Sequence, residues 1–289
     1  MTEWSVTEPV KLAPDGPVTR LRIRVVGGAV NVVGTDGSTA RVEVSEIEGP
    51  PLIVTQDGST LTVTYEDLHW KGILKWLDTK AHRRRAVVSV AVPAGAEVEV
   101  GAVTADTVVS GLRGRTEVRG VTGATTLVGL SGPVRAESVS GALEAQSVTG
   151  ALRVSSVTGD VTVIEGSGSA VRAETVSGDM VLDLDPAPAG APPADIRLSS
   201  VSGEIAIRLP HPADARVEAS TTSGSLSNAF DDLRVAGDWG TRSLTGTLGA
   251  GSGALKATTV SGAIALLRRP ESGEDPESTP TAPASGKVL

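Results

Sequence analysis

The sequence predicts an all-β protein, a single elongated parallel β-solenoid built from strand-turn units of about nine residues. The first observation behind this prediction is a glycine at every ninth position through the middle of the chain: Gly114, Gly123, Gly132, Gly141, Gly150, Gly159 and Gly168. The second is the alternation of apolar and polar residues between these glycines, which is typical of a strand with one buried side. Such a unit leaves apolar surface exposed unless neighbouring units stack on it, so the repeat indicates a solenoid.

Each unit predicts one strand followed by one turn. In the unit ALEAQSVTG (142–150), the second and fourth places are Leu143 and Ala145, and we expect both to face the interior. We also expect burial of the seventh place, which holds Val103, Leu112, Val121, Leu130, Val139, Val148 and Val157 in successive units. The small polar residue and the glycine that follow indicate a turn whose backbone angles a Cβ would resist.

Two units per rung is the preferred geometry, because residues eighteen positions apart would then be neighbours in one sheet. This geometry places Glu117 beside Arg135 and Arg119 beside Glu137, which are complementary charges. On the other sheet the third and fifth places form a nearly neutral face rich in β-branched side chains, with Val108, Thr126, Val128, Thr162 and Ile164. We call this surface the neutral face. A rung of three strands, the alternative, would scramble this segregation.

The repeat divides the chain into one long domain, 1–268, and a short tail. Within the domain we expect irregular strands over 10–66, a helical and basic insert over 67–85, regular repeats over 97–185, a Pro-rich loop over 186–194 and further repeats over 195–268. Residues 269–289 are acidic and Pro-rich, a composition that does not bury enough apolar surface to order itself. We therefore expect a disordered tail after the solenoid.

The segment 67–85 breaks the β pattern, because its apolar residues fall at helical spacing and predict a short amphipathic helix near 67–82. Its candidate interaction residues are Trp70, Ile73, Leu74, Trp76, Leu77, Arg83, Arg84 and Arg85. The first interpretation is a cap over an open end or side of the solenoid, since repeat arrays need caps. The alternatives are an interfacial helix that binds anionic lipid or a protein partner, and a plain loop.

The sequence shows little sign of catalytic chemistry. Without cysteine there are no disulfides, thiol nucleophiles or cysteine-ligated metals. The three histidines lack metal-ligand spacing, and no G-x-S-x-G nucleophile motif occurs. The string at 249–254 matches G-x-G-x-x-A, but the strand repeat continues where a phosphate-binding helix would begin. We therefore expect a protein that is not an enzyme and has no catalytic residue, cofactor or metal.

The net charge and the hydropathy of the sequence indicate which partners the protein binds and where in the cell it lies. The net charge of −8 argues against a nucleic-acid partner, because phosphate neutralisation needs clustered Lys and Arg. The first residues lack the pattern of a signal peptide, and no window approaches about 18 continuous apolar residues. We expect a cytoplasmic protein, associated with a membrane only if 67–85 binds lipid.

Three stretches carry a resemblance to a known family: the opening LRIRVVGGAVNVVGTDG (21–37), the stacked VSG and VTG turns, and the closing GAGSGALKATTVSGAIAL (249–266). They resemble the bacterial putative-adhesin domains of unknown function that are related to the head GIN domain. The resemblance covers about residues 10–268 and implies a parallel β-solenoid. It implies no catalytic or ligand-binding residues.

Three functions fit these observations. The one we favour is a non-catalytic scaffold that binds a protein partner, or a second copy of itself, through the neutral face, through 67–85 or through both. The second is a peripheral membrane protein that binds anionic lipid through 67–85. The least favoured is a carbohydrate-binding or carbohydrate-processing β-helix, because sugar sites use aromatic platforms and the chain has only four Trp, one Tyr and one Phe.

Overall fold

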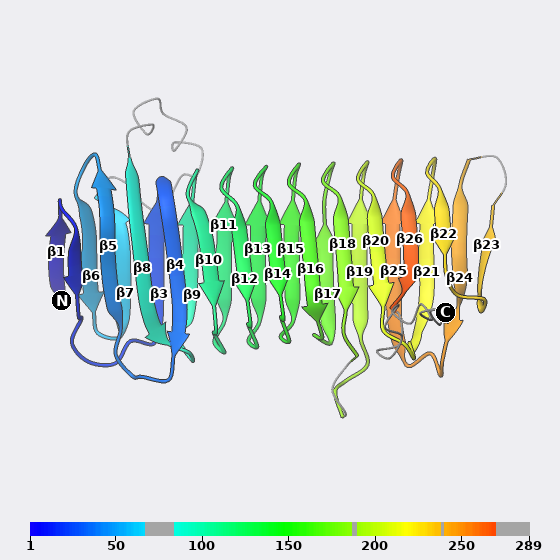
Figure 1. Ribbon diagram of the computed structural model, residues 1–289, viewed down its shortest axis with the longest axis horizontal. Helices are drawn as coiled ribbons and strands as arrows, with labels where there is room; N and C mark the ends of the chain where they lie inside the picture. Colours follow the sequence, from blue (N-terminus) through cyan, green and yellow to red (C-terminus); the bar gives the residue numbers. More distant parts are fainter. Residues whose placement is uncertain (67–83, 187–189, 238–239, 270–289) are drawn as a thin grey trace, which may run out of the picture.

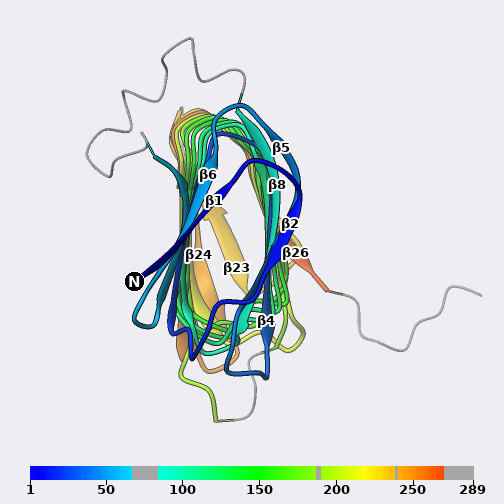
Figure 2. The same ribbon diagram turned by 90° about the vertical axis from the view of Figure 1, so that its left-hand side faces the viewer.

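Two long β-sheets face one another along the whole molecule (Figure 1). The structure is a computed structural model that describes residues 1–66, 84–186, 190–237 and 240–269, and the regular elements in these ranges are all strands. A 14-stranded sheet, sheet A, and a 12-stranded sheet, sheet B, form the two walls of a flattened tube, which Figure 2 shows end-on. The predicted all-β class is confirmed, and the two long sheets are solenoid-like, but they are mostly rather than wholly parallel.

The strands of the central array alternate between the sheets, so each rung has one strand in sheet A and one in sheet B. In spatial order, sheet A contains β1 (Thr2–Val6), β6 (Leu52–Asp57), β7 (Thr60–Tyr65), β3 (Arg20–Val25), β9 (Glu97–Ala102), β11 (Thr116–Gly120), β13 (Val134–Ser138), β15 (Leu152–Ser156), β17 (Ala170–Glu174), β19 (Asp195–Ser200), β25 (Gly253–Thr259), β21 (Ala215–Thr221), β24 (Arg242–Leu248) and β23 (Leu233–Ala236). Sheet B contains β2 (Val10–Leu12), β5 (Arg41–Glu48), β8 (Arg85–Pro93), β4 (Gly27–Thr35), β10 (Asp106–Ser110), β12 (Thr125–Val128), β14 (Leu143–Gln146), β16 (Val161–Gly166), β18 (Met180–Leu184), β20 (Ile205–Leu209), β26 (Ile264–Arg268) and β22 (Leu226–Asn228).

Neighbouring rungs of the regular array are eighteen residues apart. Leu143 in β14 pairs with Val161 in β16, a difference of 161 − 143 = 18, and Glu117 in β11 pairs with Arg135 in β13. This register confirms two units per rung and the predicted neighbours Glu117 with Arg135. Places two and four face inward, since Leu143 and Ala145 are 1% and 0% exposed. The two inner faces thus form one continuous aliphatic core.

The ninth-place glycines stack in columns at the corners where the chain passes from one sheet to the other. A Cβ on Gly141 would lie 2.0 Å from the carbonyl oxygen of Gly123, and a Cβ on Gly150 would lie 1.9 Å from that of Gly132. These glycines do not have positive φ angles. The expectation that unusual backbone angles require them was therefore wrong, because the requirement comes from the close approach of successive turns.

Where the chain passes from sheet A to sheet B, the seventh place is buried at Val103, half-buried at Val121 and exposed at Val139 and Val157. The hydroxyls of Ser138 and Ser156, at the sixth place, are buried and donate to the carbonyl oxygens three residues ahead, at 2.8 and 2.7 Å. Strand alternation then continues through the corner and turns the next residue to solvent. Val139 and Val157 are accordingly 45% and 43% exposed, which corrects the prediction that they are buried.

The opposite corner, from sheet B to sheet A, does bury its seventh place. There the sixth residue has a left-handed backbone, with φ of 67° at Gly111, 61° at Gly129 and 52° at Ser147. This conformation breaks the alternation of the strand and directs the next side chain inward. The buried residues are Leu112, Leu130 and Val148. The two corners therefore differ in the conformation of the residue before the apolar one.

At the N-terminal end, the rungs do not follow the order of the chain. The β3–β4 rung stacks on β9–β10, and the later β7–β8 rung stacks on its far side. Beyond it, β5 and β6 pair antiparallel to the stack, and β1 and β2 pair antiparallel to them (Figure 2). These antiparallel strands close an end that would otherwise present a long parallel edge.

At the other end, the last rung of the chain lies inside the stack. Strand β25 pairs with β19 on one side and β21 on the other, and β26 lies between β20 and β22 in the same way. The antiparallel strands β24 and β23 follow at the end of sheet A. Residues 253–268 thus fill a place between two rungs that precede them in the sequence.

Two predictions concern segments that the structure mostly does not describe. The helix near 67–82 lies outside the described residues, as does the tail beyond Arg269. Arg269 itself, the first residue of the predicted tail, follows β26 and forms ion pairs with Asp183, at 2.9 Å, and with Asp185.

One buried polar residue provides a test of the core. The hydroxyl of Thr116 has no hydrogen-bond partner, although the residue is fully buried at an inward place of β11. We expect Thr116→Val to raise the free energy of unfolding by about 1 kcal/mol, because it removes an unpaired polar group without changing the shape. Urea denaturation measures this change. The outward-facing Thr126→Val is the control and should change stability by less than about 0.5 kcal/mol; a loss of stability in Thr116→Val would contradict the assigned burial.

Candidate interaction surfaces

The neutral face lies on the outside of sheet B, where its predicted residues are brought together. Val108 in β10 pairs with Thr126 in β12, and Val128 lies two residues further along β12. Thr162 and Ile164 in β16 continue the same two rows beyond β14. At the third and fifth places of these four strands, Glu144 is the only charged residue. The strands thus present β-branched and amide side chains in regular rows.

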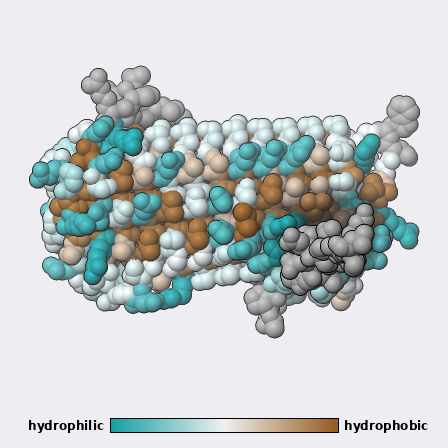
Figure 3. Space-filling view, in the orientation of Figure 1, coloured by the Kyte–Doolittle hydropathy of each residue, from teal (hydrophilic) through white to brown (hydrophobic). Residues whose placement is uncertain are grey.

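The neutral face extends further along the solenoid than the sequence indicates. Val33 in β4 pairs with Ser110, and Val181 in β18 pairs with Thr162. Val33, Val108 and Val181 are 47%, 38% and 48% exposed. Figure 3 shows the result as a band of apolar side chains along this side of the molecule. The sequence repeat did not reveal these two valines because Val33 precedes the regular repeats and Val181 follows Gly168, the last glycine of the nine-residue series.

The basic segment is described only where it enters β8. The guanidinium of Arg84 lies 5.6 Å from the centre of the Tyr65 ring, and Arg85 forms an ion pair with Glu46 at 3.7 Å. Burial raises the pKa of the Tyr65 hydroxyl, against an opposing effect of Arg84. The remaining candidate residues of this segment lie outside the described residues: Trp70, Ile73, Leu74, Trp76, Leu77 and Arg83. Arg84 and Arg85 therefore contact the solenoid itself.

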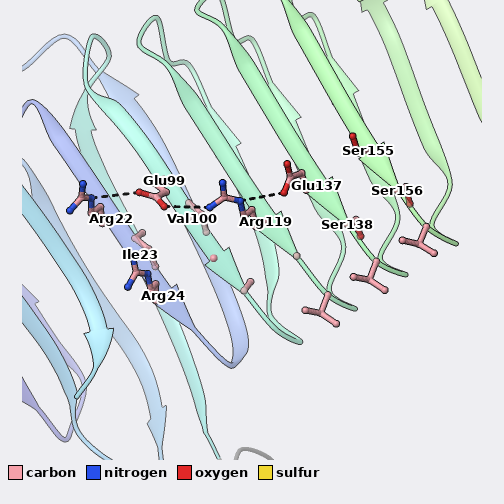
Figure 4. A pocket seen from close by; sticks show the side chains of 16 residues that line it. Arg22, Ile23, Arg24, Glu99, Val100, Arg119, Glu137, Ser138, Ser155 and Ser156 are labelled. Carbon is pink, nitrogen blue, oxygen red and sulfur yellow. Dashed lines mark hydrogen bonds and ion pairs between the residues drawn. The ribbon is translucent and has the colours of Figure 1, made fainter. Parts of the chain in front are cut away.

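A groove of about 700 Å³ lies on the outside of sheet A (Figure 4). One side is a row of alternating charges, in which Glu99 lies 3.5 Å from Arg22 and 3.8 Å from Arg119. Arg119 also contacts Glu137 at 3.3 Å, as predicted for this pair. The rest of the groove is lined by Arg24, by the serines Ser138, Ser155 and Ser156, and by small or apolar residues that include Gly101, Ala102, Gly120, Val121, Val139 and Val157. Because its charges are paired, the row links successive strands and leaves little net charge for a ligand.

Further along sheet A, five cations stack directly on one another. Arg135, Arg153, Arg172, Arg197 and Lys256 occupy the third place of β13, β15, β17, β19 and β25, each paired in register with the next. We call this row the cationic ladder. Its side chains are about half exposed, from 45% for Arg135 to 58% for Arg197. Like charges directly opposite one another on neighbouring strands are destabilising, so the ladder has an energetic cost.

A second charge cluster ties the last rung to the stack on the opposite sheet. Asp183, whose side chain is 10% exposed, forms ion pairs with Arg208 of β20 and with Arg269 after β26. The hydrogen bond from Arg208 and that from Arg269 hold the pKa of the Asp183 carboxyl below its ordinary value, and burial only partly opposes them. The cluster therefore connects three successive rungs of sheet B.

This cluster predicts a pH-dependent stability. A carboxyl with a lowered folded-state pKa stabilises the protein above its unfolded pKa of about 3.9, and this contribution is lost as the pH falls through the folded-state value. We expect Asp183→Asn to lower the free energy of unfolding by about 2 kcal/mol at pH 7. The difference should shrink below about pH 4. Urea denaturation over a pH series measures it, with the exposed Asp231→Asn as control; a difference that is constant with pH would contradict the ion pairing.

The described residues contain neither a metal centre nor a membrane helix. No group of three or more His, Asp or Glu side chains in the described ranges could hold a metal ion. Nor does any helix within those ranges have the length and apolar character to span a bilayer.

The chain belongs to the Toastrack DUF4097 family, whose domain it matches over residues 18–267. This assignment agrees with the adhesin-like resemblance of the sequence. No curated protein matches the chain.

Several solved structures are similar to the chain at low identity. A putative adhesin from Bacteroides fragilis has 9% identity and a TM-score of 0.42, covering 91% of this chain and 98% of its own. A putative lipid binding protein from Parabacteroides distasonis has 13% identity and a TM-score of 0.41, with the same coverage. A putative cell adhesion protein from Clostridium sporogenes has 11% identity and a TM-score of 0.23, covering 91% of this chain and 100% of its own.

Proposed function

We propose that the chain is a non-catalytic scaffold that binds a protein partner through the neutral face. The observation that carries this proposal is the exposed valines in the two outward rows of sheet B, Val108 and Val181 in one row and Val33 in the other, which are 38–48% exposed. A contiguous exposed apolar surface is typical of protein interaction sites, and the cores of such interfaces are depleted in charge. Valine, threonine and amide side chains supply no acid, base or nucleophile of catalytic strength.

The side chains of the neutral face also indicate what kind of surface the partner presents. A charged partner surface would lose its hydration against these side chains without gaining an opposite charge. We infer that the partner presents an apolar, uncharged surface, either of another protein or of a second copy of this chain. Membrane binding through 67–85 and a cytoplasmic location remain predictions from the sequence.

Charge placed on the neutral face tests the proposal. The double variant Val108→Lys/Thr162→Lys should lose a partner that the native chain retains in affinity purification from its own cells. Sedimentation velocity of the purified proteins then shows whether that partner is a second copy.

The matched control places two lysines on the outside of sheet A, as Ser155→Lys/Ser199→Lys. All three proteins should unfold at similar urea concentrations, because the substituted side chains point to solvent. Equal retention of the partner by the two variants would overturn the proposal.

A further inference from the structure

We propose that the acidic segment 270–289 of this chain binds along the cationic ladder on sheet A. The ladder requires an explanation, because four successive contacts between neighbouring strands join like charges: Arg135 with Arg153, Arg153 with Arg172, Arg172 with Arg197 and Arg197 with Lys256. An anionic chain lying across these strands would offset the repulsion.

The ladder is only partly neutralised by its own sheet. Asp195 serves two arginines, at 3.8 Å from Arg172 and 3.0 Å from Arg197, and Arg153 reaches Glu174 at 3.8 Å. Side chains that are about half exposed form weak ion pairs. Five cations therefore share the nearby carboxylates of Glu137, Glu174, Asp195 and Glu218, which leaves an excess of one positive charge in a protein of net charge −8.

The segment 270–289 carries carboxylates at a matching interval. Glu271, Glu274 and Glu277 are three residues apart, with Pro270 before the first and Pro276 before the last. In a polyproline II helix, residues three apart lie on one face and are separated by about 9.3 Å. Alternate strands of a sheet are separated by about 9.6 Å. Successive glutamates would therefore meet alternate cations of the ladder.

The segment 270–289 begins close to one end of the cationic ladder. Arg269 follows β26 in sheet B, and the sheet A strand of the same rung, β25, carries Lys256 at the end of the ladder. The core fills the space between the sheets, so the segment passes round the corner, as the chain does between Gln146 of β14 and Arg153 of β15. Glu274 and Glu277 are the glutamates that lie beyond such a passage. On the other side of Lys256 the next strand presents Glu218, which would repel the segment. The segment should therefore run from Lys256 toward Arg197 and Arg172.

Paramagnetic relaxation in the full chain tests the proposal. Because the chain has no cysteine, Ala282→Cys gives a single site for a nitroxide label beside the acidic residues. We expect the label to broaden the amide signals of β15, β17 and β19 and to spare those of β10 and β12. The broadening should disappear in about 1 M NaCl, where the screening length is about 3 Å.

Two sets of variants separate the ladder from general charge effects. Arg153→Ala/Arg172→Ala/Arg197→Ala should abolish the broadening, whereas Arg41→Ala/Arg113→Ala/Arg234→Ala, which removes three exposed arginines elsewhere, should leave it unchanged. A second control keeps composition and charge but breaks the interval, by Glu271→Ser, Ser272→Glu, Glu277→Ser and Ser278→Glu. It should weaken the broadening.

Several results would overturn the proposal. They are an absence of broadening on sheet A, equal broadening in the two triple-arginine variants, or equal broadening after the glutamates are moved. Broadening that arises only between a labelled and an isotope-enriched copy would also overturn it, since it would place the segment on a second molecule. None of these results bears on the neutral face, which lies on the opposite sheet.

Discussion

Gly141→Ala is expected to lower the free energy of unfolding by about 3 kcal/mol, an effect at the upper end of the range for overpacking. The added Cβ would lie 2.0 Å from the carbonyl oxygen and 2.8 Å from the carbonyl carbon of Gly123, both backbone atoms. No side chain can rotate to relieve this contact, so two successive turns must separate. The midpoint of urea denaturation measures the loss.

Gly95→Ala is the matched control for this prediction. A Cβ on Gly95 meets no atom within 4 Å, and its φ is not left-handed. This substitution should leave stability unchanged or raise it by about 0.5 kcal/mol through the unfolded chain. Equal midpoints for Gly141→Ala and Gly95→Ala would show that the turns do not stack as closely as the glycine columns require.

Leu266→Ala is expected to lower the free energy of unfolding by about 2–5 kcal/mol, because it leaves a cavity in the core. Leu266 is fully buried in β26, the strand that inserts between β20 and β22. If the last rung lay loosely at the end of the stack, this loss would be small. The prediction therefore tests the inserted position as well as the packing of one side chain.

The next residue of the same strand supplies the control. Leu267 is 46% exposed on the outside of sheet B, and Leu267→Ala should change stability by less than about 0.5 kcal/mol. Urea denaturation of the two variants compares an inward and an outward leucine with the same local sequence. Similar losses for both would contradict the assignment of β26 to the interior of the stack.

The regular array could be predicted from the sequence because each unit repeats the same physical requirements. Apolar second and fourth places fix the buried side of each strand, and the eighteen-residue register follows from the charges of Glu117 and Arg135. The reason for the glycines could not be read from one unit. It depends on the distance between Gly141 and Gly123, which exists only after stacking.

The burial of the seventh place could not be predicted from the repeat alone. The seventh place is apolar at both corners, yet Val148 is buried at one and Val139 is exposed at the other. The distinguishing residue is the sixth, which is the left-handed Ser147 in one unit and the inward-facing Ser138 in the other. The sequence does not separate the two corners, because glycine and serine occur at the sixth place of both, as Gly111 and Ser147 at one and as Gly120 and Ser138 at the other.

The order of the terminal rungs could not be predicted from the sequence. Nothing within residues 253–268 indicates that they stack between two earlier rungs, because that position depends on contacts with β20 and β22. The neutral face, in contrast, followed from the alternation of Val108 and Thr126 and required only the correct register. Its extension to Val33 and Val181 required the three-dimensional path of the irregular rungs.

Photo-crosslinking in cells tests whether the neutral face binds a protein. A photoreactive amino acid at Thr126 lies on the neutral face, and the same group at Ser155 lies on the outside of sheet A. We expect a cross-linked protein adduct from position 126 that is absent from position 155 and disappears when Val108→Lys is added. An adduct from position 155 alone, or one from position 126 that persists with Val108→Lys, would contradict the proposed binding.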